Sequence, residues 1–134
     1  MAQADGREHH SAWQQSADLV VADVPCSGLG IIRKKPDIRY KDPDTMQSLP
    51  KLQLEILKNQ SRYVKPGGVL LYSTCTLLKR ENEDVVERFL MVNKDFCLCP
   101  THIAGDDKGC VTFLPHKTMT DGFFVAKLMR KTEK

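Results

Sequence analysis

Asp18-Leu-Val-Val-Ala-Asp23-Val-Pro-Cys26-Ser-Gly-Leu-Gly30 is the stretch that decides the fold. Its apolar run with β-branched residues, Leu19 to Val21, is typical of a strand buried on both faces of a parallel sheet. Pro25 ends the strand, because proline has no N–H to give to a sheet ladder. Cys26 then falls in the loop at the carboxyl end of the strand, where open α/β sheets bind their ligands. Asp23 and Cys26 are therefore a candidate active site; the alternative is a buried acid capping the loop beside a small core cysteine.

A second strand delivers a second cysteine. A helix is expected from Ser48 or Leu49 to Tyr63, with Leu52, Ile56 and Leu57 on its apolar face. Lys65-Pro66-Gly67-Gly68 should end it, because glycine accepts positive φ and proline cannot continue a helix. Val69 to Thr74 is the next buried strand, and Cys75 follows it. The two thiols should thus lie at equivalent ends of neighbouring parallel strands.

The remaining segments close the sheet. A helix is expected from Glu81 to Val92, with Glu81, Glu83 and Asp84 complementing its positive end. Short strands are expected at 96–99 and 111–114, around a turn at 105–109, and a last strand at 123–128. This order predicts an α/β fold with parallel strands that finish in antiparallel strands. Near the start, Ala4-Asp5-Gly6 resembles the end of a strand whose earlier residues are missing.

Composition narrows the possible functions. The 134 residues suit one domain, and no run approaches the roughly 20 apolar residues of a membrane span. Residues 1–10 are polar and lack an apolar signal core, which favours a cytosolic protein. The five cysteines are an odd number, which favours reduced thiols over a disulfide framework. Cys97, Cys99 and Cys110 with His102 are a possible thiol or metal module, but their spacing matches no common zinc site, so no metal is expected.

A basic cluster follows the first cysteine loop. The net charge of +3 is too small by itself to demand a nucleic acid. The distribution is more informative, because five basic residues crowd one short segment: Arg33, Lys34, Lys35, Arg39 and Lys41. A solvated charged loop is one interpretation, and a phosphate-binding loop beside the active site is the other.

Two thiols and one acid suit a particular covalent chemistry. A thiolate adds readily to an electron-poor double bond, and carbon 6 of a pyrimidine is such a centre. Addition makes carbon 5 electron-rich and able to attack a methyl donor. One thiol would form the bond, the other would help to release the product, and Asp23 would hydrogen-bond the base. A dithiol redox pair is the competing chemistry, but it normally uses a Cys-x-x-Cys motif that this chain lacks.

The segments around Cys26 and Cys75 resemble the two cysteine motifs of the Sun/Fmu (RsmB-type) RNA cytosine methyltransferases. The most specific part of this resemblance is the pair of motifs Asp-x-Pro-Cys and Thr-Cys, each of which follows a strand. The similarity covers nearly everything from Ala4 onwards, through Asp23–Gly28, Arg33–Ile38, Pro66–Gly68, Ser73–Thr76, Glu81-Asn82 and Asp121–Leu128. It implies a Rossmann-like class I methyltransferase domain that uses S-adenosylmethionine and methylates small-subunit ribosomal RNA.

The resemblance also assigns roles. It makes Cys75 the nucleophile and Cys26 the thiol that assists release, with Asp23 contacting the target cytosine. Asp5, Asp23 and Pro25 would bind S-adenosylmethionine, and the basic cluster would contact RNA phosphates while the target base is flipped into the pocket.

One departure from the family concerns the cofactor. Its glycine-rich cofactor loop, ribose-binding acid, upstream active-site lysine and N-terminal RNA-binding domain are not in this sequence. Residues 1–134 are therefore expected to be the C-terminal half of a catalytic domain, inactive alone.

Two further expectations depend on this interpretation. The alternative to a methyltransferase is a non-catalytic RNA-binding remnant that holds RNA through the basic cluster.

In the resembled fold the strand at 19–24 lies inside the sheet, so here it should become an edge. An unprotected edge invites pairing with another chain. We therefore expect self-association through residues 19–24, unless residues 2–15 cover them.

Overall fold

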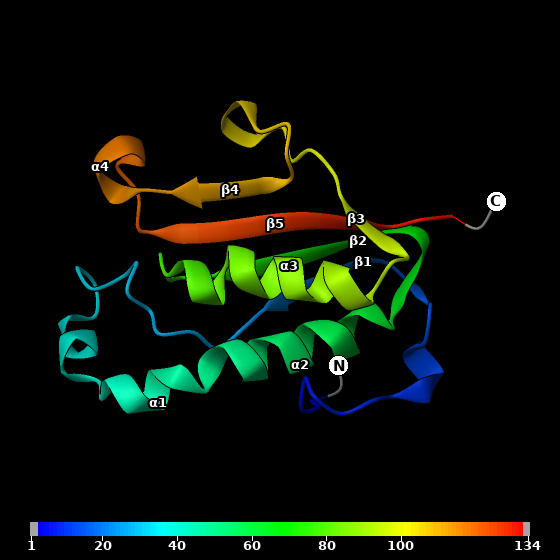
Figure 1. Cartoon of the computed structure of the whole chain (residues 1–134), viewed down its shortest axis with the longest axis horizontal. Helices are drawn as coiled ribbons and strands as arrows, with labels where there is room; N and C mark the ends of the chain where they lie inside the picture. Colours follow the sequence, from blue (N-terminus) through cyan, green and yellow to red (C-terminus); the bar gives the residue numbers. More distant parts are fainter. Residues whose placement is uncertain (1–2, 133–134) are drawn as a thin grey trace.

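The computed structural model describes residues 3–132 and contains one five-stranded sheet. Its central strands, β2 (Val64–Thr74) and β5 (Phe123–Arg130), are antiparallel neighbours. β1 (Ala17–Asp23) runs parallel to β2, while β3 (Phe96–Leu98) and β4 (Cys110–Phe113) are both antiparallel to β5 (Figure 1). The predicted α/β fold, with parallel strands that finish in antiparallel strands, is confirmed.

Two helices cover one face of the sheet. α2 (Leu49–Ser61) packs against β1, β2 and α3 (Glu83–Val92) (Figure 1). The shorter helical segments are α1 (Pro43–Gln47), α4 (Pro115–Thr118), η1 (Ser11–Trp13), η2 (Pro36–Tyr40), η3 (Lys79–Glu81) and η4 (Ile103–Gly105). Within residues 3–132, no helix is both long and apolar enough to cross a membrane.

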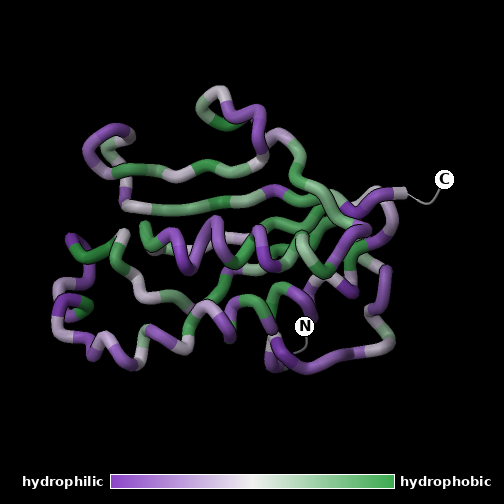
Figure 2. The backbone as a smooth tube through the Cα atoms, viewed as in Figure 1, coloured by the Kyte–Doolittle hydropathy of each residue, from purple (hydrophilic) through white to green (hydrophobic). Residues whose placement is uncertain are grey.

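The core lies between these helices and the sheet. Successive side chains of a strand point to opposite faces, so every second residue of β2 and β5 enters this layer. Figure 2 shows hydrophobic strands beside helices that carry hydrophilic residues on part of their surface. The fully buried large apolar side chains come from both helices and both central strands: Leu57, Leu70, Tyr72, Phe89, Phe124 and Leu128.

β1 is less buried than the sequence predicts. Val20 and Ala22 face the core, but the side chains of Leu19 and Val21 are 55% and 56% exposed. The expectation of burial on both faces is therefore wrong. Among the described residues β1 pairs with β2 alone, and α2 covers only one of its faces. The uncovered face contains an apolar hollow of about 430 Å³, lined in part by Leu19, Val69, Leu71, Ile103 and Val125.

The Pro66-Gly67-Gly68 segment also differs from expectation. α2 already ends at Ser61, and the glycines lie inside β2 instead of terminating the helix. The pairing shifts there from Ala17 opposite Val64 to Leu19 opposite Val69, so β2 bulges against β1. A Cβ at Gly68 would lie 3.0 Å from the Asp18 carbonyl oxygen, so glycine permits this close approach.

The N-terminal segment packs on α2. No strand forms between residues 3 and 10, so the strand end expected at 4–6 is not found there. Instead, the Asn59 side-chain amide on α2 donates hydrogen bonds to the carbonyl oxygens of Gly6 (2.8 Å) and Glu8 (2.7 Å). In the described structure this segment does not pair with β1, and the edge of that strand stays free.

Candidate active site

The two motif cysteines meet at the carboxyl ends of β1 and β2. The parallel register places Asp23 beside Ser73, and each cysteine follows within three residues. The Cys26 and Cys75 sulfurs are 3.1 Å apart, and the Cys75 N–H donates a hydrogen bond to the Cys26 sulfur at 3.3 Å. Both side chains are half-buried and neither is in a disulfide. The structure thus brings together the two thiols that the sequence places 49 residues apart.

Burial affects the proton of the Cys26 thiol. Burial, reinforced by the hydrogen bond with Cys75, raises the pKa of the Cys26 thiol from its usual 9.0 to about 12. Cys26 therefore keeps its proton at neutral pH, and its sulfur lies within hydrogen-bond distance of the Cys75 sulfur. A protonated thiol beside a second sulfur can donate a hydrogen bond to it, and the geometry allows Cys26 this role.

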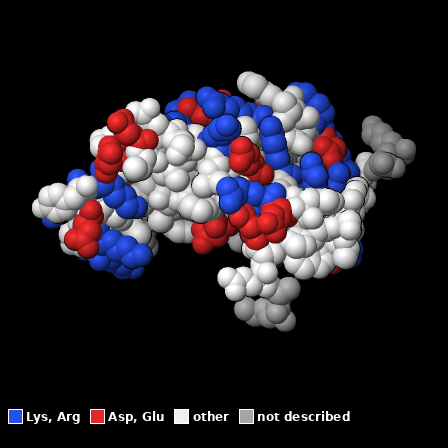
Figure 3. Space-filling model, turned by 90° about the horizontal axis from the view of Figure 1, so that it is seen from below, with Lys and Arg blue, Asp and Glu red and all other residues white. Residues whose placement is uncertain are grey.

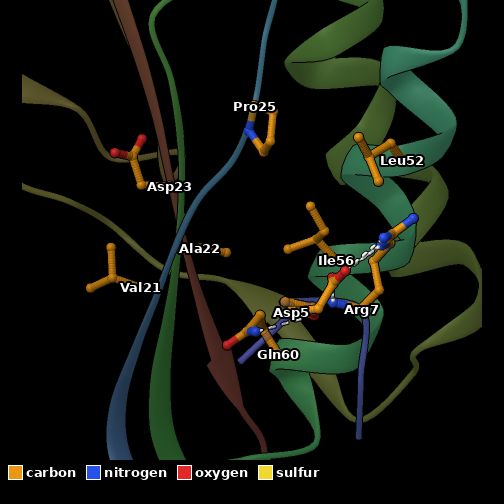
Figure 4. A pocket seen from close by; sticks show the side chains of 10 residues that line it. Asp5, Arg7, Val21, Ala22, Asp23, Pro25, Leu52, Ile56 and Gln60 are labelled. Atoms are coloured by element: carbon orange, nitrogen blue, oxygen red, sulfur yellow. Dashed lines mark hydrogen bonds and ion pairs between the residues drawn. The ribbon is translucent and has the colours of Figure 1, made fainter. Parts of the chain in front are cut away.

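Asp23 lies beside the thiol pair at the end of β1. Its carboxylate accepts a hydrogen bond of 2.9 Å from the Ser73 hydroxyl of β2. Figure 4 shows Asp23 and Val21 on one side of β1 and Ala22 on the other, as strand alternation requires. The Asp23 carboxylate consequently points away from α2.

Two glycines hold the thiol loops together. The Gly30 N–H donates to the Cys75 carbonyl oxygen at 2.9 Å, and the Gly122 N–H donates to the Gly30 carbonyl oxygen at 2.7 Å. These bonds join the loops after β1 and β2 to the segment before β5. A Cβ at Gly30 would lie 2.2 Å from the Gly122 oxygen, so only glycine fits this crossing.

A basic pocket opens over the thiols. It measures about 650 Å³, and its lining includes the two cysteines, two lysines and one acid: Cys26, Cys75, Lys35, Lys41 and Asp37. The Lys41 ammonium group donates to the Ser27 carbonyl oxygen at 3.3 Å. This volume is ample for a nucleobase.

The other basic residues of the cluster do not line this pocket. Lys34 forms an ion pair with Asp121, Arg39 donates to the Pro36 carbonyl oxygen at 3.4 Å, and Arg33 is exposed. Figure 3 shows Lys and Arg side chains at the end of the molecule that carries η2 and α1, interspersed with acidic ones.

A second pocket lies between β1 and α2. It measures about 500 Å³, and Asp5, Asp23, Pro25, Leu52 and Ile56 are among the residues that line it (Figure 4). Leu52 and Ile56, expected on the core face of the helix, are only partly buried and form an apolar wall here. The volume of this pocket and its apolar wall suit a small nucleoside ligand.

The acid of this pocket is already engaged. The Asp5 carboxylate accepts hydrogen bonds from the Arg7 side chain at 2.6 to 3.2 Å and from its backbone N–H at 2.9 Å. These bonds lower the pKa of Asp5 to about 2. Asp5 and the apolar wall fit the cofactor implied by the sequence once Arg7 gives up the Asp5 carboxylate, whereas the Asp23 carboxylate points away from α2.

Sequence reasoning missed a buried polar network behind the thiols. Glu81 was expected at the start of a helix, but α3 begins at Glu83 and the Glu81 side chain is fully buried. It accepts hydrogen bonds from Ser27 and Gln53, and Asn82 bonds to Thr74. The only sequence signal that pointed to these two residues was the family resemblance, which includes Glu81-Asn82.

The remaining cysteines form no comparable site. Cys97, Cys99 and Cys110 are free and half-buried. Burial raises the pKa of Cys110 to about 11, which makes it a poor metal ligand at neutral pH. Within residues 3–132 no three His, Cys, Asp or Glu side chains are grouped to hold a metal ion, so nothing there supports a metal module.

Comparison with known proteins defines the class first. The chain matches the crystal structure of PH0851 with a TM-score of 0.80 at 39% identity, over 86% of this chain and 27% of that one. It matches NSun6 from Pyrococcus horikoshii with SFG, an S-adenosylmethionine analogue, with a TM-score of 0.73 at 30% identity, over 99% and 34% of the two chains. The fold is that of S-adenosylmethionine-dependent methyltransferases.

Sequence similarity then gives the family. The chain is 41% identical to the ribosomal RNA small subunit methyltransferase B of Salmonella newport over 133 residues, which is 96% of this chain and 30% of that protein. The chain belongs to the 16S rRNA methyltransferase RsmB/F family, whose model matches residues 1–129. It spans less than a third of the length of such relatives.

Proposed function

We propose that this chain carries the catalytic cysteines of an S-adenosylmethionine-dependent RNA cytosine 5-methyltransferase that acts on small-subunit ribosomal RNA. The observation that carries the proposal is the thiol pair, with sulfurs 3.1 Å apart in a basic pocket. Membership of the RsmB/F family supports the substrate. Because the chain spans 30% of its Salmonella relative, residues 1–134 are proposed as part of a catalytic domain.

Cys75 is the nucleophile in this proposal. Its thiolate, stabilised by the Cys26 thiol, forms a bond to carbon 6 of the target cytosine. The electron pair of the 5,6 double bond moves to carbon 5, which takes the methyl group that S-adenosylmethionine supplies. Asp23 lies beside the thiols, where it hydrogen-bonds the base and favours its activated form.

Cys26 assists release of the product. After methyl transfer, carbon 5 carries both a methyl group and a proton. The proton must leave so that the double bond reforms and the bond from carbon 6 to the Cys75 sulfur breaks. Cys26 is the nearby sulfur, and it takes the carbon-5 proton after its own proton has passed to solvent. Cys75 returns as the thiolate.

The basic cluster provides the RNA contacts. A cytosine in a duplex must leave the stack to reach a thiol, and the pocket over Cys26 and Cys75 can receive it. Lys35 and Lys41 line that pocket, and with the other three basic residues of the cluster, Arg33, Lys34 and Arg39, they are proposed to bind phosphates. An RNA substrate and free thiols together favour a cytoplasmic location.

A chimera tests the function. This chain replaces the matching segment of the Salmonella newport methyltransferase B, and methyl transfer from S-adenosylmethionine to cytosine in small-subunit ribosomal RNA is measured. We expect transfer with the native residues and none with Cys75→Ala. Cys26→Ala should instead leave protein covalently trapped on RNA. RNA binding without transfer by the native chimera would favour the non-catalytic RNA-binding alternative.

We also propose self-association through β1. Leu19 and Val21 are exposed on an edge strand that neither proline nor lysine interrupts. Light scattering across a dilution series should show a mass above that of one chain, falling with dilution. Val21→Lys places a charge on the exposed face and should give a monomer. A native chain that is monomeric at every concentration would refute this.

A further inference from the structure

Two consecutive polar residues, Glu81 and Asn82, are buried directly before α3. Their side chains are 0% and 1% exposed. A buried carboxylate is costly unless hydrogen bonds satisfy it. Each of the two side chains is satisfied by a different cysteine loop, and neither forms a hydrogen bond with a sulfur atom.

Glu81 holds the loop of Cys26. Its carboxylate oxygens accept from the Ser27 N–H at 2.9 Å and from the Ser27 hydroxyl at 2.6 Å. The side-chain amide of Gln53 on α2 donates to the same carboxylate at 2.8 Å and to the Pro25 carbonyl oxygen at 2.9 Å. The residues on both sides of Cys26 are thereby anchored to one buried pair of side chains.

Asn82 holds the loop of Cys75. Its side-chain oxygen accepts from the Thr74 hydroxyl at 2.6 Å, and its side-chain N–H donates to the Thr76 carbonyl oxygen at 3.0 Å. Thr74 and Thr76 are the two neighbours of Cys75 along the chain. The position of this sulfur therefore depends on Asn82, as that of Cys26 depends on Glu81.

One hydroxyl pair joins the two halves. The hydroxyls of Ser27 and Thr76 are 2.7 Å apart. Because the Ser27 hydroxyl donates its proton to the Glu81 carboxylate, Thr76 must donate to Ser27. The Tyr72 hydroxyl donates to the Glu81 carbonyl oxygen at 2.5 Å and holds the dipeptide itself against β2.

We infer that Glu81 and Asn82 are positioning residues for the two thiols, Glu81 for Cys26 and Asn82 for Cys75. The geometry does not depend on the reaction, but its consequence rests on the proposed function. Loss of the Asn82 contacts slows the attack on carbon 6. Loss of the Glu81 contacts slows release, so that the covalent RNA adduct accumulates. An ordinary satisfied polar core would give neither division.

Alkylation of the native chain tests the inference directly. Iodoacetamide is applied between pH 6 and 10, and the rate at each cysteine is followed by peptide mass spectrometry in Glu81→Gln, Asn82→Ala and the native chain. Asn59→Ala is the matched control, because Asn59 is also a buried amide with several hydrogen bonds, on α2 and bonded to the N-terminal segment. Circular dichroism checks that each variant is folded.

We expect each variant to act mainly on its own thiol. Glu81→Gln should change the Cys26 rate by at least about threefold more than the Cys75 rate, which corresponds to half a pKa unit, and Asn82→Ala should do the reverse. Equal effects on both thiols, or effects no larger than those of Asn59→Ala, would overturn the inference. If a variant fails to fold, Ser27→Ala removes the hydroxyl bond to Glu81 and Thr74→Val removes the hydroxyl bond to Asn82, with the same expected pattern at smaller size.

The same variants in the chimera separate this inference from the proposed function. With an active chimera, Glu81→Gln should increase the covalent RNA adduct on a denaturing gel, and Asn82→Ala should decrease it. The opposite pattern would overturn the inference. An inactive native chimera with the expected alkylation pattern would remove the proposed function and leave the positioning of the thiols in place.

Discussion

Replacing Gly30 by alanine tests the crossing that joins the two thiol loops to the segment before β5. The added Cβ would lie 2.2 Å from the Gly122 oxygen and 2.9 Å from the Cys75 carbonyl oxygen. Both are backbone atoms, so no side chain can rotate away. The loops must separate, and the hydrogen bonds from Gly30 to Cys75 and from Gly122 to Gly30 are lost.

The cost can be worked out from these contacts. Two hydrogen bonds contribute about 1 kcal/mol each. Forcing the backbones apart adds at least about 1 kcal/mol of overpacking strain. The free energy of unfolding should therefore fall by about 3 kcal/mol. For a chain of 134 residues, the unfolding entropy near the midpoint converts this to a decrease in Tm of about 10 °C.

Thermal unfolding followed by circular dichroism measures the effect. Gly6→Ala is the control, because a Cβ there would meet Ile56 at an ordinary 3.5 Å and no positive φ is involved. Its Tm should stay within about 2 °C of the native value, since changes without a clash are worth less than about 0.5 kcal/mol. If Gly30→Ala also stayed within that range, the crossing would not restrain the loops and the reasoning would be refuted.

Four other predictions concern the thiols, the RNA and the cofactor. At pH 8, Cys26 should be alkylated about 30-fold more slowly in the folded chain than in urea. A pKa of about 12 leaves about a thousandth of the thiolate that an ordinary cysteine has, and the higher nucleophilicity of that thiolate recovers only part of the rate. Between about pH 9 and 12 only the unfolded chain loses the Cys26 proton, so the free energy of unfolding should fall as pH rises through this range. A urea midpoint that stays constant over the same range would contradict this prediction. The Tyr40 side chain is 83% exposed between Arg39 and Lys41, and it should stack on an RNA base. In fluorescence anisotropy, Tyr40→Ala should weaken binding of single-stranded RNA about 5- to 100-fold without changing its salt dependence. Tyr40→Phe should keep the affinity, because the ring remains. The chain alone should bind S-adenosylmethionine weakly, because Arg7 occupies the Asp5 carboxylate and Asp23 points away from α2, and micromolar binding in calorimetry would contradict this.

Local sequence signals were enough to predict the meeting of the two thiols. Pro25 ends one strand, and the helix between the strands requires a parallel neighbour. Parallel strands in register then bring Asp23, Ser73 and both cysteines to one edge, as the structure shows. The residues alone suggested covalent addition to a pyrimidine, whereas the separate roles of Cys75 and Cys26 were assigned by the family resemblance.

The supporting contacts could not be predicted because they are long-range. Glu81 bonds to Ser27, 54 residues away, and to Gln53, 28 residues away, so its burial leaves no local pattern. A glutamate before an amphipathic helix has the same local signature whether it caps the helix or is buried. The exposure of the Leu19 side chain could not be predicted for a similar reason, because an apolar run indicates a strand but not which elements cover its faces.

In the proposed function, the ion pair between Lys34 and Asp121 makes RNA binding and loop restraint compete for one ammonium group. The Lys34 side chain is 68% exposed, and a pair of this kind contributes at most about 1 kcal/mol. A phosphate that takes Lys34 therefore loses no more than about fivefold in affinity to the competition. Asp121, freed by that exchange, precedes the glycine that holds Gly30. Phosphate binding at Lys34 is thus thermodynamically linked to the ion pair that restrains the segment before Gly122, and added salt weakens both interactions of Lys34 together.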